Sequence, residues 1–91
     1  MREISISKLA RKFMRRLPQK HERQIIDRIT KLGDDPYASD TQFLKNLKPL
    51  RRADIGEYRI AYEIRALLIE VVAVGKRNDS EIYKELRRRY G

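Results

Sequence analysis

The chain has 91 residues, with 22 lysines and arginines against 13 aspartates and glutamates, a net charge of +9 and a pI near 10.2. A chain of this length buries roughly 60–65% of its unfolded surface, so we expect one domain over residues 1–91. It has no cysteine and one histidine, His21, which argues against disulfides, thiolate metal sites and serine or cysteine triads that use a histidine base. No segment approaches the roughly 18 apolar residues of a membrane span, and no signal-peptide block follows the first residues. We therefore expect a soluble, cytoplasmic protein without membrane contact.

Positive charge is concentrated at both ends of the chain. Residues 1–23 carry eight cations and two anions, and residues 76–90 carry six and three. Such an excess favours a polyanionic partner, which is a nucleic acid, an acidic protein or, less readily, an anionic membrane face. Charge alone leaves open the alternative that lysine and arginine only solvate helix faces.

The first half of the chain predicts a strand and a helical hairpin. Ile4 and Ile6 alternate with polar residues as in a short strand, and Ser7 can then cap a helix over Lys8–Arg16. Apolar residues at every fourth position give that helix one core face, and its other face is basic. A second helix is predicted to begin near Pro18.

The second helix is expected to stop at Gly33, a good left-handed terminator. Its apolar residues have helical spacing, and His21 on its basic side is expected to be a surface residue. Residues 43–50 are interrupted by lysines and a proline, which predicts an irregular connection.

The second half predicts a sheet and a terminal helix. Period-two alternation over Tyr58–Ile64 predicts a strand, and the apolar run Leu67–Val74 predicts a central strand that ends at Gly75. A third, basic strand is expected near Arg51–Asp54, and Asn78 is expected to cap a short last helix. We expect an α+β fold: a small single domain whose N-terminal strand and helical hairpin pack on a mainly antiparallel sheet, followed by a short C-terminal helix.

Four residues are candidates for an anion site. A long cation such as Arg59 is tolerated within a strand only at an exposed or functional face. Arg77 lies where a strand gives way to a helix N-terminus, which favours an anion, and Tyr83 can reach the same rim. With Arg52, these side chains can converge on one phosphate.

Each of these residues also has a plainer explanation. Arg59 can form an ion pair with Glu63 or Glu70, Arg77 can be an ordinary loop cation, and Tyr83 can be a core or rim aromatic. Asp54 is most simply a turn residue.

A family resemblance joins these fragments. Gly56–Ile64, with its G-x-Y-R strand, the following apolar strand and then Gly75–Tyr83, with G-K-R and a helical tyrosine, resemble the RelE/ParE superfamily of type II toxin–antitoxin toxins, closest to its RelE-like branch. The opening from Ile4 to Pro18 also resembles that family. The resemblance implies an endoribonuclease that cuts messenger RNA in the ribosomal A site by attack of the 2′-hydroxyl, and that forms a hetero-oligomer with a cognate antitoxin. No metal or organic cofactor is expected.

The resemblance also assigns roles to residues. Arg59 would hold the scissile phosphate, Arg77 would stabilise charge and protonate the leaving 5′ oxygen, Tyr83 would orient the substrate, and Arg52 would replace one of the family's two basic residues on the preceding strand. Further basic residues are expected to bind RNA: Arg51, Lys76, Lys48 and Lys45.

One position departs from the family pattern, because Asp54 stands where a second cation is expected. Either the register near Pro49–Ala53 differs so that Arg51 and Arg52 both serve, or this chain cuts weakly. Three functions therefore stay open: a ribonuclease toxin, a ParE-like inhibitor that binds DNA gyrase without cleaving it, and a non-catalytic module that binds RNA or protein.

Overall fold

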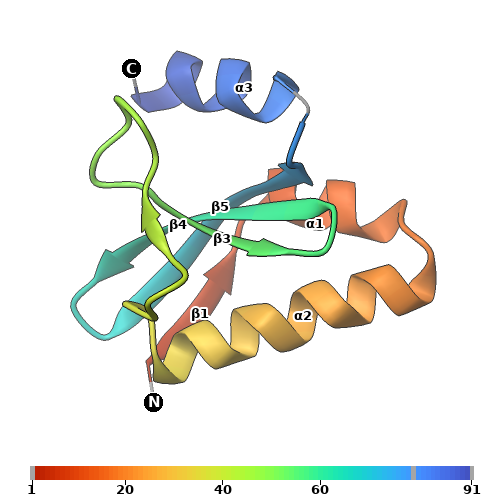
Figure 1. Ribbon diagram of the computed structural model, residues 1–91, viewed down its shortest axis with the longest axis horizontal. Helices are drawn as coiled ribbons and strands as arrows, with labels where there is room; N and C mark the ends of the chain where they lie inside the picture. The colour runs from red at the N-terminus through yellow and green to blue at the C-terminus, as the bar shows by residue number, and fades with distance from the viewer. Residues whose placement is uncertain (1, 79, 91) are drawn as a thin grey trace.

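The computed structural model describes residues 2–78 and 80–90 (Figure 1). Its elements confirm the predicted α+β class and the chain order of strand, helical hairpin, strands and terminal helix. The helices are α1 (Lys8–Arg15), α2 (Gln19–Asp34) and α3 (Glu81–Tyr90), and the strands are β1 (Glu3–Ile6), β2 (Gln42–Phe43), β3 (Arg51–Ile55), β4 (Tyr58–Arg65) and β5 (Leu68–Lys76).

The strands form one sheet in the order β1-β5-β4-β3-β2. Among the strands of the described residues, only β1 runs parallel to its neighbour. Strands β2 to β5 pair antiparallel, so the prediction of a mainly antiparallel sheet is confirmed. The hairpin of β4 and β5 turns at Ala66, which has a positive φ of 49°. The three arginines among the catalytic candidates thus lie on three adjacent strands or at their ends, and Tyr83 lies on α3.

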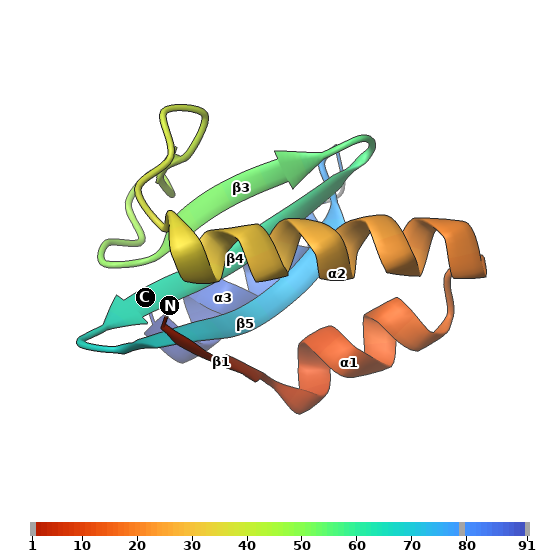
Figure 2. The same cartoon turned by 90° about the horizontal axis from the view of Figure 1, so that it is seen from below.

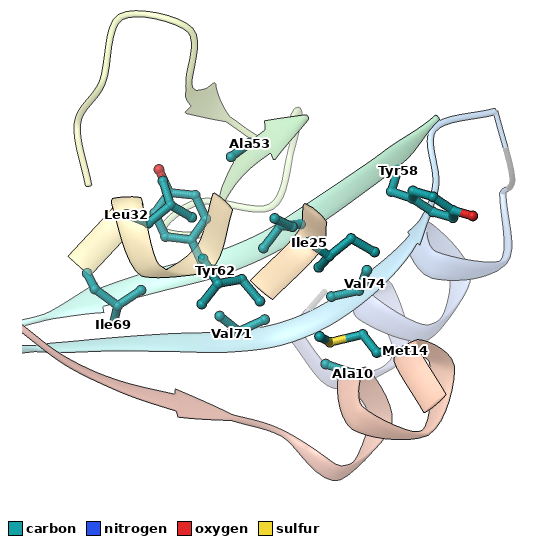
Figure 3. Packing of buried hydrophobic residues seen from close by; sticks show 12 residues of the cluster. Ala10, Met14, Ile25, Leu32, Ala53, Tyr58, Tyr62, Ile69, Val71 and Val74 are labelled. Atoms are coloured by element: carbon teal, nitrogen blue, oxygen red, sulfur yellow. The ribbon is translucent and has the colours of Figure 1, made fainter. Parts of the chain in front are cut away.

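Helices α1 and α2 cover one face of the sheet, and α3 covers the other (Figure 2). Between the sheet and α1 and α2 lies the larger hydrophobic cluster, which includes Ile25, Tyr62 and Val71 (Figure 3). The fully buried Tyr62 donates its hydroxyl proton to the Pro36 carbonyl oxygen at 2.6 Å. The alternation of β4 directs four of its side chains into this cluster: Tyr58, Ile60, Tyr62 and Ile64.

A second cluster lies under α3. Ile82 and Leu86 pack there on Ala61 and Ala73 of the sheet. The connection after α2 adds three buried leucines to it, Leu44, Leu47 and Leu50. The sheet therefore carries a hydrophobic cluster on each face.

Two glycines have structural roles that differ from the predictions. Helix α2 does not stop at Gly33 but continues to Asp34. A Cβ on Gly33 would lie 3.2 Å from Ile4 Cδ1 and 3.3 Å from the Arg2 carbonyl oxygen, so the glycine allows β1 to approach the helix. Likewise β5 passes through Gly75 to Lys76, and a Cβ on Gly75 would lie 3.1 Å from Ile82 Cβ. Both glycines permit close packing rather than ending an element.

Other boundaries shift by one or a few residues. Ser7 caps α1 as predicted, since its Oγ accepts from the Ala10 amide at 3.1 Å, but Arg16 is the C-cap rather than a helical residue. Helix α3 begins at Glu81, so Asn78 lies in the preceding turn instead of capping the helix, and Asp79 lies outside the described residues.

The predicted irregular connection is confirmed apart from its first residue, Phe43, which ends β2. His21 is half-buried rather than on the surface, because α2 crosses β4 and brings its Nδ1 to 2.7 Å from the Tyr58 hydroxyl. Within residues 2–78 and 80–90, no helix is both long and apolar enough to cross a bilayer.

Candidate active site

Three arginines meet at the carboxylate of Asp54. Arg59, its cross-strand partner on β4, donates from Nε to Oδ1 at 2.8 Å and from Nη2 to Oδ2 at 3.2 Å. Arg52 lies two residues before Asp54 on β3 and donates from Nη1 to Asp54 Oδ2 at 3.0 Å. Arg77, just beyond β5, has its Nε 3.4 Å from Oδ2. We call Arg52, Arg59, Arg77 and Asp54 the arginine cluster.

The register of the sheet produces this cluster. Residues opposite each other in an antiparallel pair project from the same face, as do residues two apart along one strand. Arg52, Asp54 and Arg59 therefore share the face that α3 covers. The backbone N–H of Arg77 donates to the Glu57 carbonyl oxygen at 2.9 Å, which holds the chain after β5 beside the turn between β3 and β4.

Tyr83 contacts the arginine cluster from α3, the helix that covers this face of the sheet. Its hydroxyl accepts a hydrogen bond from Arg59 Nη1, and its ring centroid lies 6.0 Å from Arg59 Cζ. The packing of Ile82 against Gly75 fixes this part of the helix. The structure thus brings together the four residues that were expected to converge, Arg52, Arg59, Arg77 and Tyr83.

The electrostatics of the cluster keep Asp54 ionised. Burial raises the pKa of its carboxyl, but the hydrogen bond and charge of Arg59 and the charges of Arg52 and Arg77 outweigh burial, so the pKa lies below its usual value of 3.8. The hydrogen bond to Asp54 in turn raises the pKa of Arg59 above its ordinary value. Three positive groups and one negative group leave the cluster with a net charge of +2, which favours binding of an anion.

Asp54 is therefore the partner of Arg59, and the expectation of a turn residue is wrong, because Asp54 lies within β3. The alternative pairing of Arg59 with Glu63 or Glu70 is wrong. Those two carboxylates lie instead 3.2 and 3.9 Å from Nη2 of Arg65, at the other end of β4.

Arg51 does not join the cluster. It pairs with Tyr62 and so projects from the face opposite to Arg52. Its Nη2 donates to Thr41 Oγ1 at 2.9 Å, and its Cζ lies 5.0 Å from the ring centroid of Phe43. The register that would let Arg51 and Arg52 both serve is thus not the one that β3 adopts.

The three lysines expected to bind RNA lie at separate places around the cluster. Lys76 is exposed beside Arg77 and lines a groove with it. Lys45 lines a cleft on the α3 side. Lys48 lies with its Nζ 4.9 Å from the ring centroid of Phe43, near Arg51.

The cleft beside the cluster has a volume of about 650 Å³ and opens between the 44–50 connection and α3. It is lined by four of the residues predicted from the sequence, Arg52, Arg59, Tyr83 and Lys45. Arg87, which was not among the predicted residues, also lines it. A signal for Arg87 was available, because it follows Tyr83 by four residues and so lies on the same side of a helix.

A family model matches this chain over most of its length. The family model described as ParE toxin of type II toxin–antitoxin system matches residues 4–81. A search among curated proteins finds no significant sequence match.

Several solved structures are similar. The isolated RelE toxin of Escherichia coli has a TM-score of 0.73 at 20% identity, over 98% of each chain. An archaeal RelE–RelB complex from Pyrococcus horikoshii gives 0.73 at 24% identity, over 85% of this chain and 96% of that one. YafQ from E. coli gives 0.66 at 18% identity, over 85% and 94%. At these identities the likeness shows a shared fold.

Proposed function

The chain belongs to the ParE toxin family of type II toxin–antitoxin systems. Within that family, we propose that it is an endoribonuclease that cuts messenger RNA in the ribosomal A site. One observation carries the proposal: Arg52, Arg59, Arg77 and Tyr83 meet at one place that keeps a net positive charge. Guanidinium groups bind phosphate oxygens in fixed geometry, and a tyrosine hydroxyl next to them can orient the nucleotide.

The reaction is transfer of the phosphoryl group to the neighbouring 2′ oxygen. The 2′-hydroxyl oxygen attacks phosphorus and releases its proton to water, the bond from phosphorus to the 5′ oxygen breaks, and the 5′ oxygen takes up a proton. The products are a 2′,3′-cyclic phosphate and a 5′-hydroxyl. The pentacovalent intermediate carries more negative charge than the substrate. Fixed arginines therefore stabilise the transition state more than the ground state.

Each residue has a distinct task in this proposal. Arg59, the least exposed of the three arginines, holds the scissile phosphate. Arg77, half-exposed at the rim, stabilises the developing charge and gives a proton to the leaving 5′ oxygen. Tyr83 orients the ribose or base, and Arg52 adds positive charge beneath the phosphate.

Dependence on the ribosome follows from the chemistry of these groups. Arginine is a poor proton carrier at neutral pH, and His21 is hydrogen-bonded to Tyr58 on the α2 side of the sheet. Much of the rate must then come from the alignment of the 2′-hydroxyl with the phosphate, which the ribosome can impose on a bound codon.

An antitoxin is proposed as the protein partner in a hetero-oligomer. The similar RelE from P. horikoshii was solved in complex with RelB, and a RelBE2 toxin–antitoxin complex from Mycobacterium tuberculosis is also similar. An acidic segment that folds on binding would complement the net charge of +9. Co-purification with the product of a neighbouring gene tests this, and failure to bind or to neutralise toxicity would count against it. The cytoplasm, where ribosomes are, is the proposed location.

Gyrase inhibition is the second candidate, favoured by the match to the ParE family model and by Asp54 within the arginine cluster. A supercoiling assay with purified gyrase separates the two candidates. Inhibition of supercoiling without any messenger cleavage would replace the ribonuclease proposal.

The deciding experiment is primer extension on a translated messenger with purified ribosomes, with free RNA as a control. Arg77→Ala is expected to lower A-site cleavage about 100-fold or more, as loss of one preorganised charge contact does. Its stability should change by about 1 kcal/mol or less, because the side chain is half-exposed. Arg88→Ala, which removes an exposed charge paired with Glu85, is the matched control. Full cleavage by folded Arg77→Ala protein would refute the proposed role.

A further inference from the structure

The cleft between the 44–50 connection and α3, named here the α3 cleft, continues from the arginine cluster. Arg52 and Arg59 of the cluster line it, and Tyr83 lines it from the helix. In Figure 1 the connection rises on the left toward the C-terminal end of α3. A ligand held by the cluster therefore has a direct path into this cleft.

Both walls of the α3 cleft are held by the same hydrophobic cluster. Leu44, Leu47 and Leu50 are each at most 4% exposed and pack with Ile82 and Leu86 of the helix. Backbone bonds also close the connection on itself, since the Leu44 amide donates to the Leu50 carbonyl oxygen at 2.9 Å. Because buried leucines recur at every third residue, the polar residues between them project outward from a well-anchored wall.

The charges lining the cleft are all positive. Lys45 stands on the wall of the connection, Arg87 stands on α3, and no carboxylate is among the described lining residues. The next two arginines of the helix, Arg88 and Arg89, lie 3.5 and 3.4 Å from carboxylate oxygens of Glu85. Within residues 2–78 and 80–90, no salt bridge joins Arg87 or Lys45 to a carboxylate. Their charge is thus available to an anionic ligand.

We propose that the α3 cleft is a second phosphate subsite, which holds the RNA phosphate next to the scissile one, with Arg87 as its main cation and Lys45 opposite. Arg87 lies four residues beyond Tyr83 along α3, a rise of about 6 Å. That rise suits the step from one phosphate to the next along an extended single strand. The inference rests on the proposed function in taking RNA as the ligand, but it concerns binding and does not require cleavage.

The subsite is tested by binding of single-stranded RNA tetranucleotides with a 2′-deoxy sugar at the cleavage position, measured by fluorescence anisotropy. One internucleotide linkage at a time is replaced by a neutral methylphosphonate. Neutralising the linkage next to the scissile one should weaken binding to the wild type about fivefold or more, and should not further weaken binding to Arg87→Gln. Such non-additivity identifies a direct contact. The slope of log affinity against log salt should also fall by about 0.7 in Arg87→Gln.

Arg88→Gln is the matched control, because it removes the same charge from the same helix. Its effect is expected to be small and equal for every position of the neutral linkage. Equal effects of Arg87→Gln and Arg88→Gln, additivity with the neutral linkage, or no RNA binding at low salt would overturn the subsite. Loss of binding to an acidic peptide but not to RNA in Arg87→Gln would overturn it in favour of a protein partner.

The two proposals can fail separately. Positional coupling at Arg87 without any ribosomal cleavage would keep the subsite and refute the ribonuclease. Cleavage that needs Arg77 but shows no coupling at Arg87 would refute the subsite alone. Far-UV circular dichroism of each variant separates loss of contact from loss of folding.

Discussion

At the scale of the single residue, Asp54 sets the strength of the arginine cluster. Its carboxylate occupies hydrogen-bonding positions on three guanidinium groups that a phosphate would also use. It therefore competes with an anionic ligand, and it also holds Arg52 and Arg59 in one orientation. Competition has the larger effect on affinity, because a unit charge 4 Å away contributes about 1 kcal/mol even in bulk water and more at a protein surface.

Asp54→Asn should therefore bind RNA or pyrophosphate about fivefold more tightly, or better, at low ionic strength. Asparagine keeps the shape of the side chain and a carbonyl acceptor for Arg59. Isothermal titration measures the change, and Asp40→Asn, which alters the ion pair with Arg28, is the control. Unchanged or weaker binding by Asp54→Asn would mean that alignment of the arginines outweighs competition.

The lowered pKa of Asp54 also makes stability depend on pH. A carboxyl whose pKa is lower in the folded than in the unfolded state stabilises the fold fully above the unfolded value, about pH 4. That contribution is lost as the pH falls through about 4 and then through the lower folded value. Urea unfolding of wild type and Asp54→Asn between pH 7 and pH 2.5 should thus show a difference that is constant above about pH 5 and shrinks in acid. A difference independent of pH would contradict this origin.

At the scale of the element, alternation and helical spacing predicted β4, α1 and α2, because side-chain periodicity follows directly from backbone geometry. The roles of Gly33 and Gly75 were not predictable, since they depend on an element distant in sequence that approaches the glycine. For the site, strand position and the nearby helix N-terminus predicted that the arginines and Tyr83 converge, and the family resemblance assigned their catalytic roles. The contacts of Asp54, and the placement of Arg51 on the opposite face, required the register of β3 against β4.

Gly75→Ala should displace α3, because the new Cβ would meet Ile82 Cβ at 3.1 Å, an atom close to the helix backbone that cannot turn away. We expect a loss of about 1–3 kcal/mol in the free energy of unfolding and a fall in cleavage as Tyr83 moves away from Arg59. Denaturant unfolding and primer extension measure the two effects. Ala73→Gly, at a neighbouring position of β5, is a control that alters the strand without adding volume against α3. Wild-type cleavage by Gly75→Ala would show that the helix can shift without cost to the site.

At the scale of the whole molecule, one sheet carries two hydrophobic clusters with different tasks. The cluster under α1 and α2 contains Ile25 and Tyr62, and its residues come from both of these helices and from strands β1, β3, β4 and β5. The cluster under α3 contains Leu86 and the buried leucines of the 44–50 connection, and it holds both walls of the α3 cleft. The catalytic candidates lie on the second side, so global stability and site geometry depend on different side chains.

Ile25→Ala and Leu86→Ala should therefore have separable effects, although both residues are at most 1% exposed. Ile25→Ala removes packing from the main cluster, so we expect a loss of about 2–5 kcal/mol in global stability with near-normal RNA binding by the molecules that stay folded. Leu86→Ala weakens the packing of α3 on the sheet. Because the rest of the fold can stay folded with α3 undocked, the loss in the free energy of global unfolding cannot exceed the free energy of undocking that helix. Amide hydrogen exchange should then show faster exchange confined to α3 and the 44–50 connection, together with weaker RNA binding. Uniformly faster exchange in Leu86→Ala would instead mean that the two clusters unfold as one cooperative unit.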